Sequence, residues 1–440
     1  MQRVDVPSTF IGWLYRPYFD FGDWEGDGNA AVEGLALAVR SLVEESDDYP
    51  RLHGFSPSSV RREIVRHAML PEYLLDDPAE LAPDLRTPAW RFLCEQLARY
   101  SALGGRARMR VLWALHRAGL HASVLRHERG PTAPTGPRLD DDTAALAFMR
   151  GQALYAQAMD GAPADAAAVE LRAVRERARP GSWAHVETTY LLASICVKML
   201  DDVPGFLRCL EQHAQSIEAS ESIGHEQNKL LSRYHRIAAL APQLAGDHGA
   251  MSREMNQAEY FCALMQRDTP LTRAEWAPLR YALLESRIKE MFVLGDFERA
   301  EQYAVSLTEH MPSEPRALLT LGQAYVERDK IPEAVNAYRR ATLIGPQVTH
   351  MAQFMMGQCL EHLGDMEAAR SAYVRAAASD PLGTSTLQLL DRDGIAGTEG
   401  PLRRWVDARS ASLREEQGTV GELHGYQKYD GKMGAAARRP

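Results

Sequence analysis

Residues 315–346 read PRALLTLGQAYVERDKIPEAVNAYRRATLIGP, in which two helical segments flank the short turn Asp329-Lys330. Small and apolar residues recur every three or four positions in each segment, which is the spacing of one face of an α-helix. Pro346 closes the stretch because proline cannot continue a helix. The stretch therefore predicts a helical hairpin whose two apolar faces are turned toward each other.

The same pattern returns at a fixed interval on both sides of this hairpin. The matches 35 residues further on are Gly322 with Gly357, Ala334 with Ala369, Tyr338 with Tyr373, Ala341 with Ala376, and Pro346 with Pro381. The matches 34 residues earlier are Gly295, Ala300 and Pro312, and the departures there are Ile288 and Ala304. Three tandem units of this length are typical of repeat proteins, in which hairpins bury their apolar faces by stacking.

This succession resembles the tetratricopeptide repeat (TPR), a family whose unit carries Leu-Gly, Tyr, Ala, an aromatic, Ala and Pro in order. The residues that fill those positions in the central unit are Leu321, Gly322, Tyr325, Ala334, Tyr338, Ala341 and Pro346. The resemblance implies an all-α fold, a right-handed α-solenoid of TPR-like helical hairpins, with three recognisable units in residues 281–381. It also implies a scaffold or adaptor for a protein or peptide, bound in the concave groove of the solenoid.

In this family the first helix of each repeat lines the groove. The candidate partner-binding residues carried over from the family positions are Lys289, Phe292, Arg316, Leu319, Gln323, Phe354, Gln358 and His362. Apolar anchors among amides and a few charges suit an extended peptide. One subfamily clamps a carboxylate terminus with Lys and Asn at the fifth and ninth positions. Leu319 and Gln323 stand there in the central unit, so that clamp is not predicted.

Composition and periodicity divide the whole chain into seven predicted segments. They are 1–28, an aromatic-rich arm; 29–130, a helical N-terminal domain; 131–142, a linker; 143–280, degenerate TPR-like hairpins; 281–381, the recognisable units; 382–416, capping helices; and 417–440, a flexible tail. Before the recognisable units, helices are predicted at 29–45, 57–69, 87–100, 106–128, 143–160, 165–177, 183–200, 204–220, 230–244, 251–266 and 276–294.

Aromatic residues crowd the first 28 positions of the chain. The candidates for a second partner surface are Trp13, Tyr15, Tyr18 and Trp24. Large exposed apolar patches are rare on soluble proteins. Packing of these rings on the first helices is therefore the competing interpretation.

The formal net charge of -9 argues against general nucleic-acid binding. A DNA-binding head nevertheless stays open, because the predicted helix at 57–69 carries Arg61, Arg62 and Arg66, and a basic helix can enter the major groove. Peptide-responsive regulators join such a head to TPR units. A regulator with an N-terminal effector domain is therefore the alternative hypothesis to a scaffold.

Sequence motifs for catalysis or metal binding are not found. The five cysteines are scattered and odd in number, which indicates buried thiols on helices and neither a disulfide framework nor a zinc site. The acidic turn that begins at Asp23 has Gly34 where a calcium loop needs glutamate. We expect no cofactor, no metal and no catalytic residue. A non-classical enzyme or enzyme subunit, with a site between the N-terminal arm and the solenoid, is the third hypothesis.

The N-terminal residues lack the basic and apolar regions of a secretory signal. A run of about 18 apolar residues, which a membrane-spanning helix needs, is also missing from the sequence. We therefore expect a cytoplasmic location and no membrane partner. The heavy use of Ala and Arg is typical of bacteria with GC-rich genomes, and the sequence does not indicate an oligomeric state.

Overall fold

The computed structural model of the protein describes residues 30–47, 49–51, 77–81, 83, 86, 88–129, 137–159, 162–312, 314–344, 348–379, 403–404 and 407–408. Contacts divide the chain into two compact units, with the boundary between Asp296 and Phe297. Among the described residues, all regular secondary structure is helical and no strand is present. The all-α solenoid fold class predicted from the sequence is confirmed. None of the described helices combines the length and apolar character needed to cross a membrane.

Several predicted segments lie outside the described residues. They are the arm with Trp13, Tyr15, Tyr18 and Trp24, the basic helix at 57–69, the first half of the linker at 131–142, and nearly all of the segments 382–416 and 417–440.

The first unit consists of twelve described α-helices and two short 3-10 helices. They are α2 (Ala30–Glu44), η2 (Pro78–Glu80), α4 (Pro88–Ala98), η4 (Tyr100–Ala102), α5 (Gly105–Arg117), α6 (His121–His127), α7 (Asp141–Met159), α8 (Asp165–Arg177), α9 (Trp183–Lys198), α10 (Val203–Glu218), α11 (Gly224–Ala238), α12 (Leu240–Leu244), α13 (His248–Ala263) and α14 (Pro270–Leu294).

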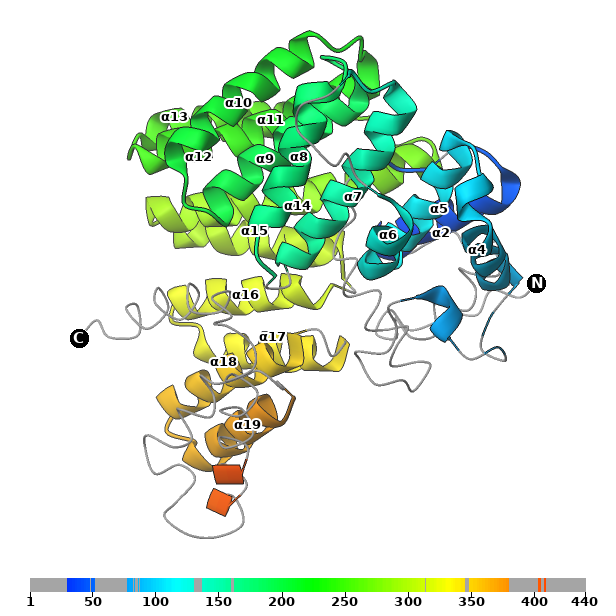
Figure 1. The fold of residues 1–440 in the computed structure, drawn as a ribbon. Helices are drawn as coiled ribbons and strands as arrows, with labels where there is room; N and C mark the ends of the chain where they lie inside the picture. The colour runs from blue at the N-terminus through cyan, green and yellow to red at the C-terminus, as the bar shows by residue number, and fades with distance from the viewer. Residues whose placement is uncertain are drawn as a thin grey trace. The chain divides into compact units, whose positions relative to one another are not determined.

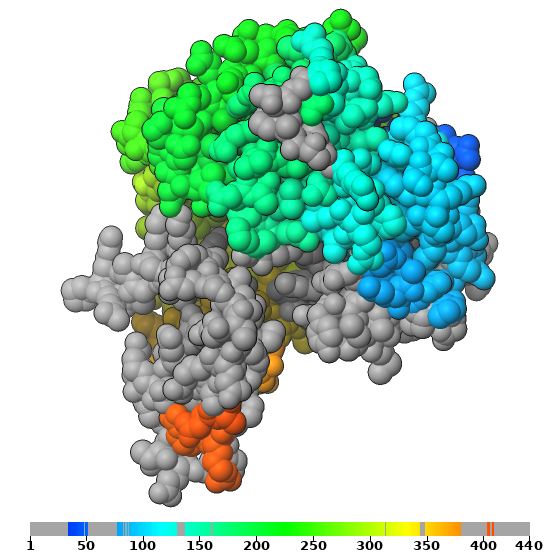
Figure 2. Space-filling model, in the orientation of Figure 1, coloured from blue at the N-terminus to red at the C-terminus, as the bar shows by residue number. Residues whose placement is uncertain are grey.

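Consecutive helices of this unit lie side by side as pairs (Figure 1). The pairs are α7 with α8, α9 with α10, and α11 with α13, and each pair packs on the next. One hydrophobic core runs from Leu35 to Ile237 and so crosses the linker predicted at 131–142. The side chains of α7–α10 form a continuous surface in the space-filling view, cyan to green (Figure 2). The core thus links successive hairpins, as stacking requires.

Helix α2 also packs against both α5 and α14. The N-terminal helix therefore meets the last helix of its own unit, more than 200 residues away in the sequence. The backbone N–H of Arg51, just after α2, donates a hydrogen bond to the Glu275 carboxylate of α14 at 3.1 Å. This long-range contact brings the segment after α2 beside the first turns of later helices.

Two predicted helices have different limits in the structure. The single helix predicted at 106–128 is wrong, because the chain breaks into α5 and α6 at Gly119, whose φ is 76°. That left-handed conformation suits glycine and ends a helix. The helix predicted from 230 begins at Gly224, and a second short helix, α12, follows it. The first turn of α11 is polar and includes His225 and Glu226, so the periodicity of apolar residues does not indicate where this helix begins.

The second unit holds α15 (Phe297–His310), α16 (Pro315–Glu327), α17 (Ile331–Ile344), α18 (Thr349–His362) and α19 (Met366–Ser379). Each of these helices packs on the next one in sequence. Asp329 makes the turn between α16 and α17 with a φ of 59°, and Gly364 makes the turn between α18 and α19 with a φ of 80°. Both lie at the turn positions predicted from the sequence.

The repeated glycines mark the closest approach within each hairpin of the second unit. A Cβ atom at Gly322 would lie 2.3 Å from Cε1 of Tyr338, and one at Gly357 would lie 2.5 Å from Cε1 of Tyr373. Both tyrosine rings are fully buried. The aromatic residue of each unit therefore packs on the glycine of its own hairpin, and any larger side chain there would push the ring away.

Candidate partner-binding site

Helix α16 carries three of the predicted groove residues on one face. Arg316, Leu319 and Gln323 are spaced three and four residues apart, so their side chains leave the helix in similar directions. Arg316 is exposed and Gln323 is half-buried, whereas Leu319 is only 8% exposed. Arg316 and Gln323 are thus accessible to a partner, and Leu319 contributes mainly to packing.

Helix α18 carries the next three predicted groove residues, again on one face. Phe354, Gln358 and His362 are spaced four residues apart. Gln358 and His362 are exposed, and Phe354 is half-buried with its ring 5.9 Å from the ring of Tyr373. Because Tyr373 belongs to α19, the second helix of the hairpin braces the Phe354 ring and leaves one side of it accessible.

The last two predicted groove residues, Lys289 and Phe292, lie on α14 in the first unit. Lys289 is exposed and Phe292 is half-buried. Lys289 lies close enough to Lys198 of α9 and Glu285 of α14 to share an electrostatic environment with them.

The first unit also contains a cavity of about 730 Å³ that the sequence did not indicate. It is lined by the first turns of α9, α11 and α14 and by the segment after α2. Its lining residues are Asp47, Tyr49, Arg51, Gly181, Trp183, Val186, Ser222, Ile223, Gly224, His225, Glu226, Leu230, Gln266, Leu271, Thr272 and Glu275. The volume falls within the range of cavities that hold small ligands or single side chains of a partner.

Glu275 organises the charged wall of this cavity. Its carboxylate accepts hydrogen bonds from Lys229 Nζ at 3.0 Å, from His225 Nε2 at 3.1 Å and from the Arg51 backbone N–H. Burial raises the pKa of Glu275, but Lys229 and the hydrogen bonds outweigh burial and hold that pKa at about 2. Lys229 is itself 1% exposed and also pairs with Glu226. This part of the lining is therefore a connected network of charged and hydrogen-bonded side chains.

His225 is held in one tautomer within this network. Its Nδ1 accepts a hydrogen bond from the Gln266 backbone N–H at 3.1 Å, so Nε2 carries the proton that Glu275 accepts. Both ring nitrogens are thereby engaged in hydrogen bonds within the wall of the cavity.

Apolar side chains also line the cavity. The Ile223 side chain is 82% exposed at the start of α11. Trp183 lies at the start of α9, and its buried Nε1–H has no hydrogen-bond partner among the described residues. No group of three or more His, Cys, Asp and Glu in the described part of the chain could hold a metal ion.

Comparison with known families identifies the repeated helices. The family model described as Tetratricopeptide repeat matches residues 292–348 and, in an overlapping second match, residues 319–383. Residues 292–383 are tetratricopeptide repeats. The matched residues include Phe292 and all of α16 and α18, and therefore seven of the eight predicted groove residues.

Solved structures with a similar fold include two of a human protein. The chain is similar to a human IFIT1 dimer with m7Gppp-AAAA, at 11% identity over 96% of this chain and 84% of that chain, with a TM-score of 0.44. It is also similar to a human IFIT1 dimer with PPP-AAAA, at 13% identity over 99% of this chain and 94% of that chain, with a TM-score of 0.40. Scores at this level support no inference about the ligand of this chain. Curated protein sequences gave no match.

Proposed function

We propose that this protein is a scaffold that binds an extended segment of a partner protein along the exposed faces of α16 and α18. The proposal rests mainly on one observation. Gln323 and Gln358 occupy matched positions in the two TPR units, 35 residues apart, and the fold uses neither side chain in its core. A side-chain amide both donates and accepts hydrogen bonds, so a repeated pair can bind successive backbone amides of an extended peptide.

The residues around this amide pair support the same proposal. Arg316 adds a positive charge at the start of α16, and Phe354 adds an accessible aromatic face on α18. Val326 is 37% exposed one turn beyond Gln323. A peptide with alternating apolar and acidic side chains would satisfy these groups, because the apolar side chains can anchor it and the acidic ones can pair with Arg316.

The first step of the test is affinity purification of the tagged protein from its native cells. A captured partner is then mapped to a peptide, and the dissociation constant of that peptide is measured with purified chains. The groove variant carries Arg316→Ala, Gln323→Ala, Phe354→Ala and Gln358→Ala. We expect it to bind the peptide at least about 30-fold more weakly, because truncated interface residues typically cost about 1 kcal/mol or more each at the centre of a contact.

A matched control variant changes exposed residues of the second helices instead. Asn336→Ala, Arg339→Ala and Arg370→Ala lie on α17 and α19, and binding should stay within about twofold of the parent chain. Circular dichroism establishes that each variant is folded. Equal loss of binding in both variants, or none in the groove variant, would show that the α16 and α18 faces are not the binding site.

The cavity of the first unit supplies the competing location. An Ile223→Ser variant changes its exposed apolar wall and leaves the TPR units intact. Loss of the partner in this variant alone would move the site to the cavity. A captured molecule that disappears after nuclease treatment would show a nucleic-acid partner and overturn the proposal. The regulator and enzyme hypotheses depend on the N-terminal segments outside the described residues. A partner that binds all three variants as tightly as the parent chain would favour these two hypotheses.

A further inference from the structure

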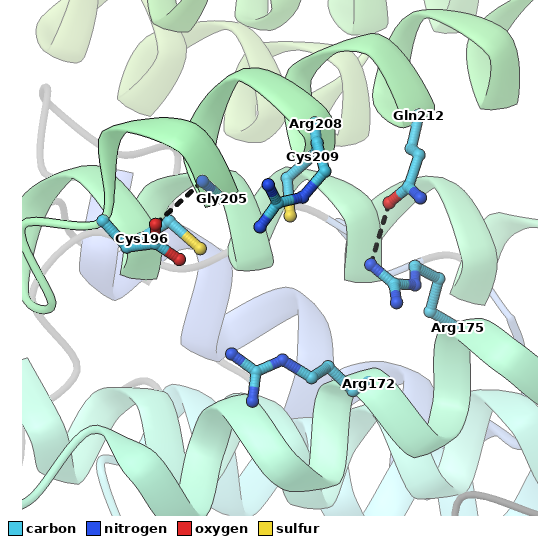
Figure 3. A pocket seen from close by; sticks show the side chains of 8 residues that line it. Arg172, Arg175, Cys196, Gly205, Arg208, Cys209 and Gln212 are labelled. Atoms are coloured by element: carbon cyan, nitrogen blue, oxygen red, sulfur yellow. Dashed lines mark hydrogen bonds between the residues drawn. The ribbon is translucent and has the colours of Figure 1, made fainter.

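A second, smaller cavity of about 160 Å³ lies against α8, α9 and α10 (Figure 3). Cys196 of α9 and Cys209 of α10 both line it, and Figure 3 shows their side chains at the same opening. The two thiols interact, so each thiol influences the protonation of the other. The cysteine side chains are largely buried, at 3% and 8% exposed, yet the cavity gives a small molecule access to them.

The two helices that carry these cysteines form one of the tightest hairpins of the first unit. α9 packs along α10, and the connection is held by Asp202, whose carboxylate caps α10 by accepting a hydrogen bond from Gly205 N–H at 2.8 Å. Thr189 of α9 also hydrogen-bonds to His213 of α10 at 3.0 Å between Oγ1 and Nδ1. The two cysteines therefore line one cavity on neighbouring, tightly packed helices.

Three arginine side chains surround the same opening. Arg172 and Arg175 come from α8, and Arg208 comes from α10 (Figure 3). Arg175 Nη1 donates a hydrogen bond to Gln212 at 2.8 Å, which holds its guanidinium group at the edge of the cavity. Positive charge next to a thiol favours the thiolate, because it stabilises the anion that forms when the proton leaves.

The charge around the pair is uneven, and it distinguishes the two sulfur atoms. The hydrogen bond from Cys196 and the charges of Arg175, Arg172 and Arg208 lower the pKa of Cys209 to about 7, against the effect of burial. The hydrogen bond to Cys209, burial and the nearby Asp202 raise the pKa of Cys196. These directions assign the nucleophilic role to Cys209 and the proton-bearing role to Cys196 in the reaction proposed below.

The other three cysteines lack this arrangement. Cys94 of α4 is half-buried, and burial raises its pKa. Cys262 of α13 and Cys359 of α18 are buried, and burial raises the pKa of each to about 11. Chemistry at Cys209 would thus be selective within this chain.

We propose that Cys209 and Cys196 are a redox-active pair that a hydroperoxide converts into a reversible disulfide between α9 and α10. The Cys209 thiolate attacks the terminal oxygen of the hydroperoxide, an S–O bond forms, the O–O bond breaks, and the alkoxide leaves and takes a proton as the alcohol. Cys209 is then a sulfenic acid. The Cys196 sulfur attacks the Cys209 sulfur, and the displaced hydroxide takes the Cys196 proton as water. Two thiols and one hydroperoxide thus give one disulfide, one alcohol and one water.

A dithiol reductant reverses this reaction. One of its thiolates attacks a sulfur of the disulfide and forms a mixed disulfide, and its second thiol releases the protein thiol and becomes oxidised itself. The oxidised state joins two helices at a point within their packed length. It therefore holds the α9–α10 hairpin against local opening, whereas the reduced state leaves only packing to do so.

The test uses the full reduced chain and hydrogen peroxide as the simplest hydroperoxide. We expect intact mass to fall by two hydrogens, peptide mapping to join the Cys196 and Cys209 peptides, and dithiothreitol to reverse both changes. In the Cys196→Ser variant, the sulfenic acid should persist on Cys209 and be labelled by a sulfenic-acid reagent. In the Cys209→Ser variant no disulfide should form. A Cys262→Ser control should behave as the parent chain does.

The pH dependence of alkylation separates this proposal from incidental oxidation of a buried thiol. Iodoacetamide should modify Cys209 with a midpoint near pH 7, rather than near the value of about 8.5 for an ordinary thiol. Arg172→Ala with Arg208→Ala should move the midpoint upward and slow alkylation at pH 6 by at least about twofold. An ordinary midpoint, or a disulfide that joins other cysteines equally fast, would overturn the proposal.

Discussion

Replacement of Gly322 by alanine should destabilise the second unit, although alanine favours a helix over glycine by about 1 kcal/mol. The added Cβ would lie 2.3 Å from Cε1 of Tyr338 and 2.6 Å from its Cζ. Carbon atoms in contact are normally about 3.5–4.0 Å apart, so the ring would have to move by more than 1 Å. The Tyr338 side chain is fully buried between α16, α17 and their neighbours and has no empty space to enter.

The magnitude follows from two opposing terms. Overpacking of a well-packed core costs about 1–3 kcal/mol, and an overlap this large belongs at the upper end of that range. The helix preference of alanine offsets about 1 kcal/mol of the cost. The net free energy of unfolding should therefore fall by about 2 kcal/mol.

Urea denaturation followed by circular dichroism gives the overall change. Amide hydrogen exchange in α16 and α17 reports whether the loss is local to the altered hairpin. Gly249→Ala is the matched control, because Gly249 is exposed on α13 and the nearest atom to an added Cβ is 3.5 Å away. This control should gain about 0.5–1 kcal/mol. A Gly322→Ala chain as stable as the control would refute the close approach of glycine and tyrosine.

Three further predictions concern buried polar groups. Tyr338→Phe should raise the free energy of unfolding by about 1 kcal/mol, because the buried Tyr338 hydroxyl has no partner among the described residues. Tyr373→Phe should lower it by about 1 kcal/mol, because the Tyr373 hydroxyl donates a hydrogen bond of 2.8 Å. Urea titrations of the two variants measure both changes. Burial and the nearby Arg233 lower the pKa of His213 to about 3, so unfolding takes up a proton at any pH between that value and about 6.5. Stability should be complete above pH 6.5 and fall by about 1.4 kcal/mol per unit below it, and His213→Gln should flatten the profile between pH 6.5 and 5, before carboxylates titrate. Glu275→Ala should cost about 3 kcal/mol, because it leaves the Lys229 ammonium buried with a single carboxylate partner, and a Lys229→Met, Glu275→Leu double variant should recover most of that loss in the same assay.

Local spacing in the sequence was sufficient to predict the TPR hairpins. The turn at Asp329 lies where two polar residues interrupt the apolar periodicity. Such a hairpin is predictable because the helix period and a short turn bring its two helices together without help from the rest of the chain. The packing of Tyr338 on Gly322, and of Tyr373 on Gly357, was found only in the structure.

Local spacing in the sequence predicted the solvent exposure of the groove residues only in part. Helical spacing placed Arg316 and Gln323 on the same face of α16 as Leu319. Yet Leu319 is 8% exposed, whereas Arg316 is exposed to solvent. Burial at one position of a helix face depends on the side chains of the neighbouring hairpin, and these do not appear in the local pattern.

The sequence by itself determined that this chain is a series of helical hairpins ending in TPR units, because each hairpin is a local structure with its own apolar faces. Only the tertiary structure decided which distant residues meet. Arg51 reaches Glu275 across 224 positions, and Cys196 and Cys209, expected to be separate buried thiols, share one opening with arginines from a third helix. The physical reason is that long-range contacts depend on how successive hairpins stack and curve, and small rotations at each interface accumulate along the solenoid.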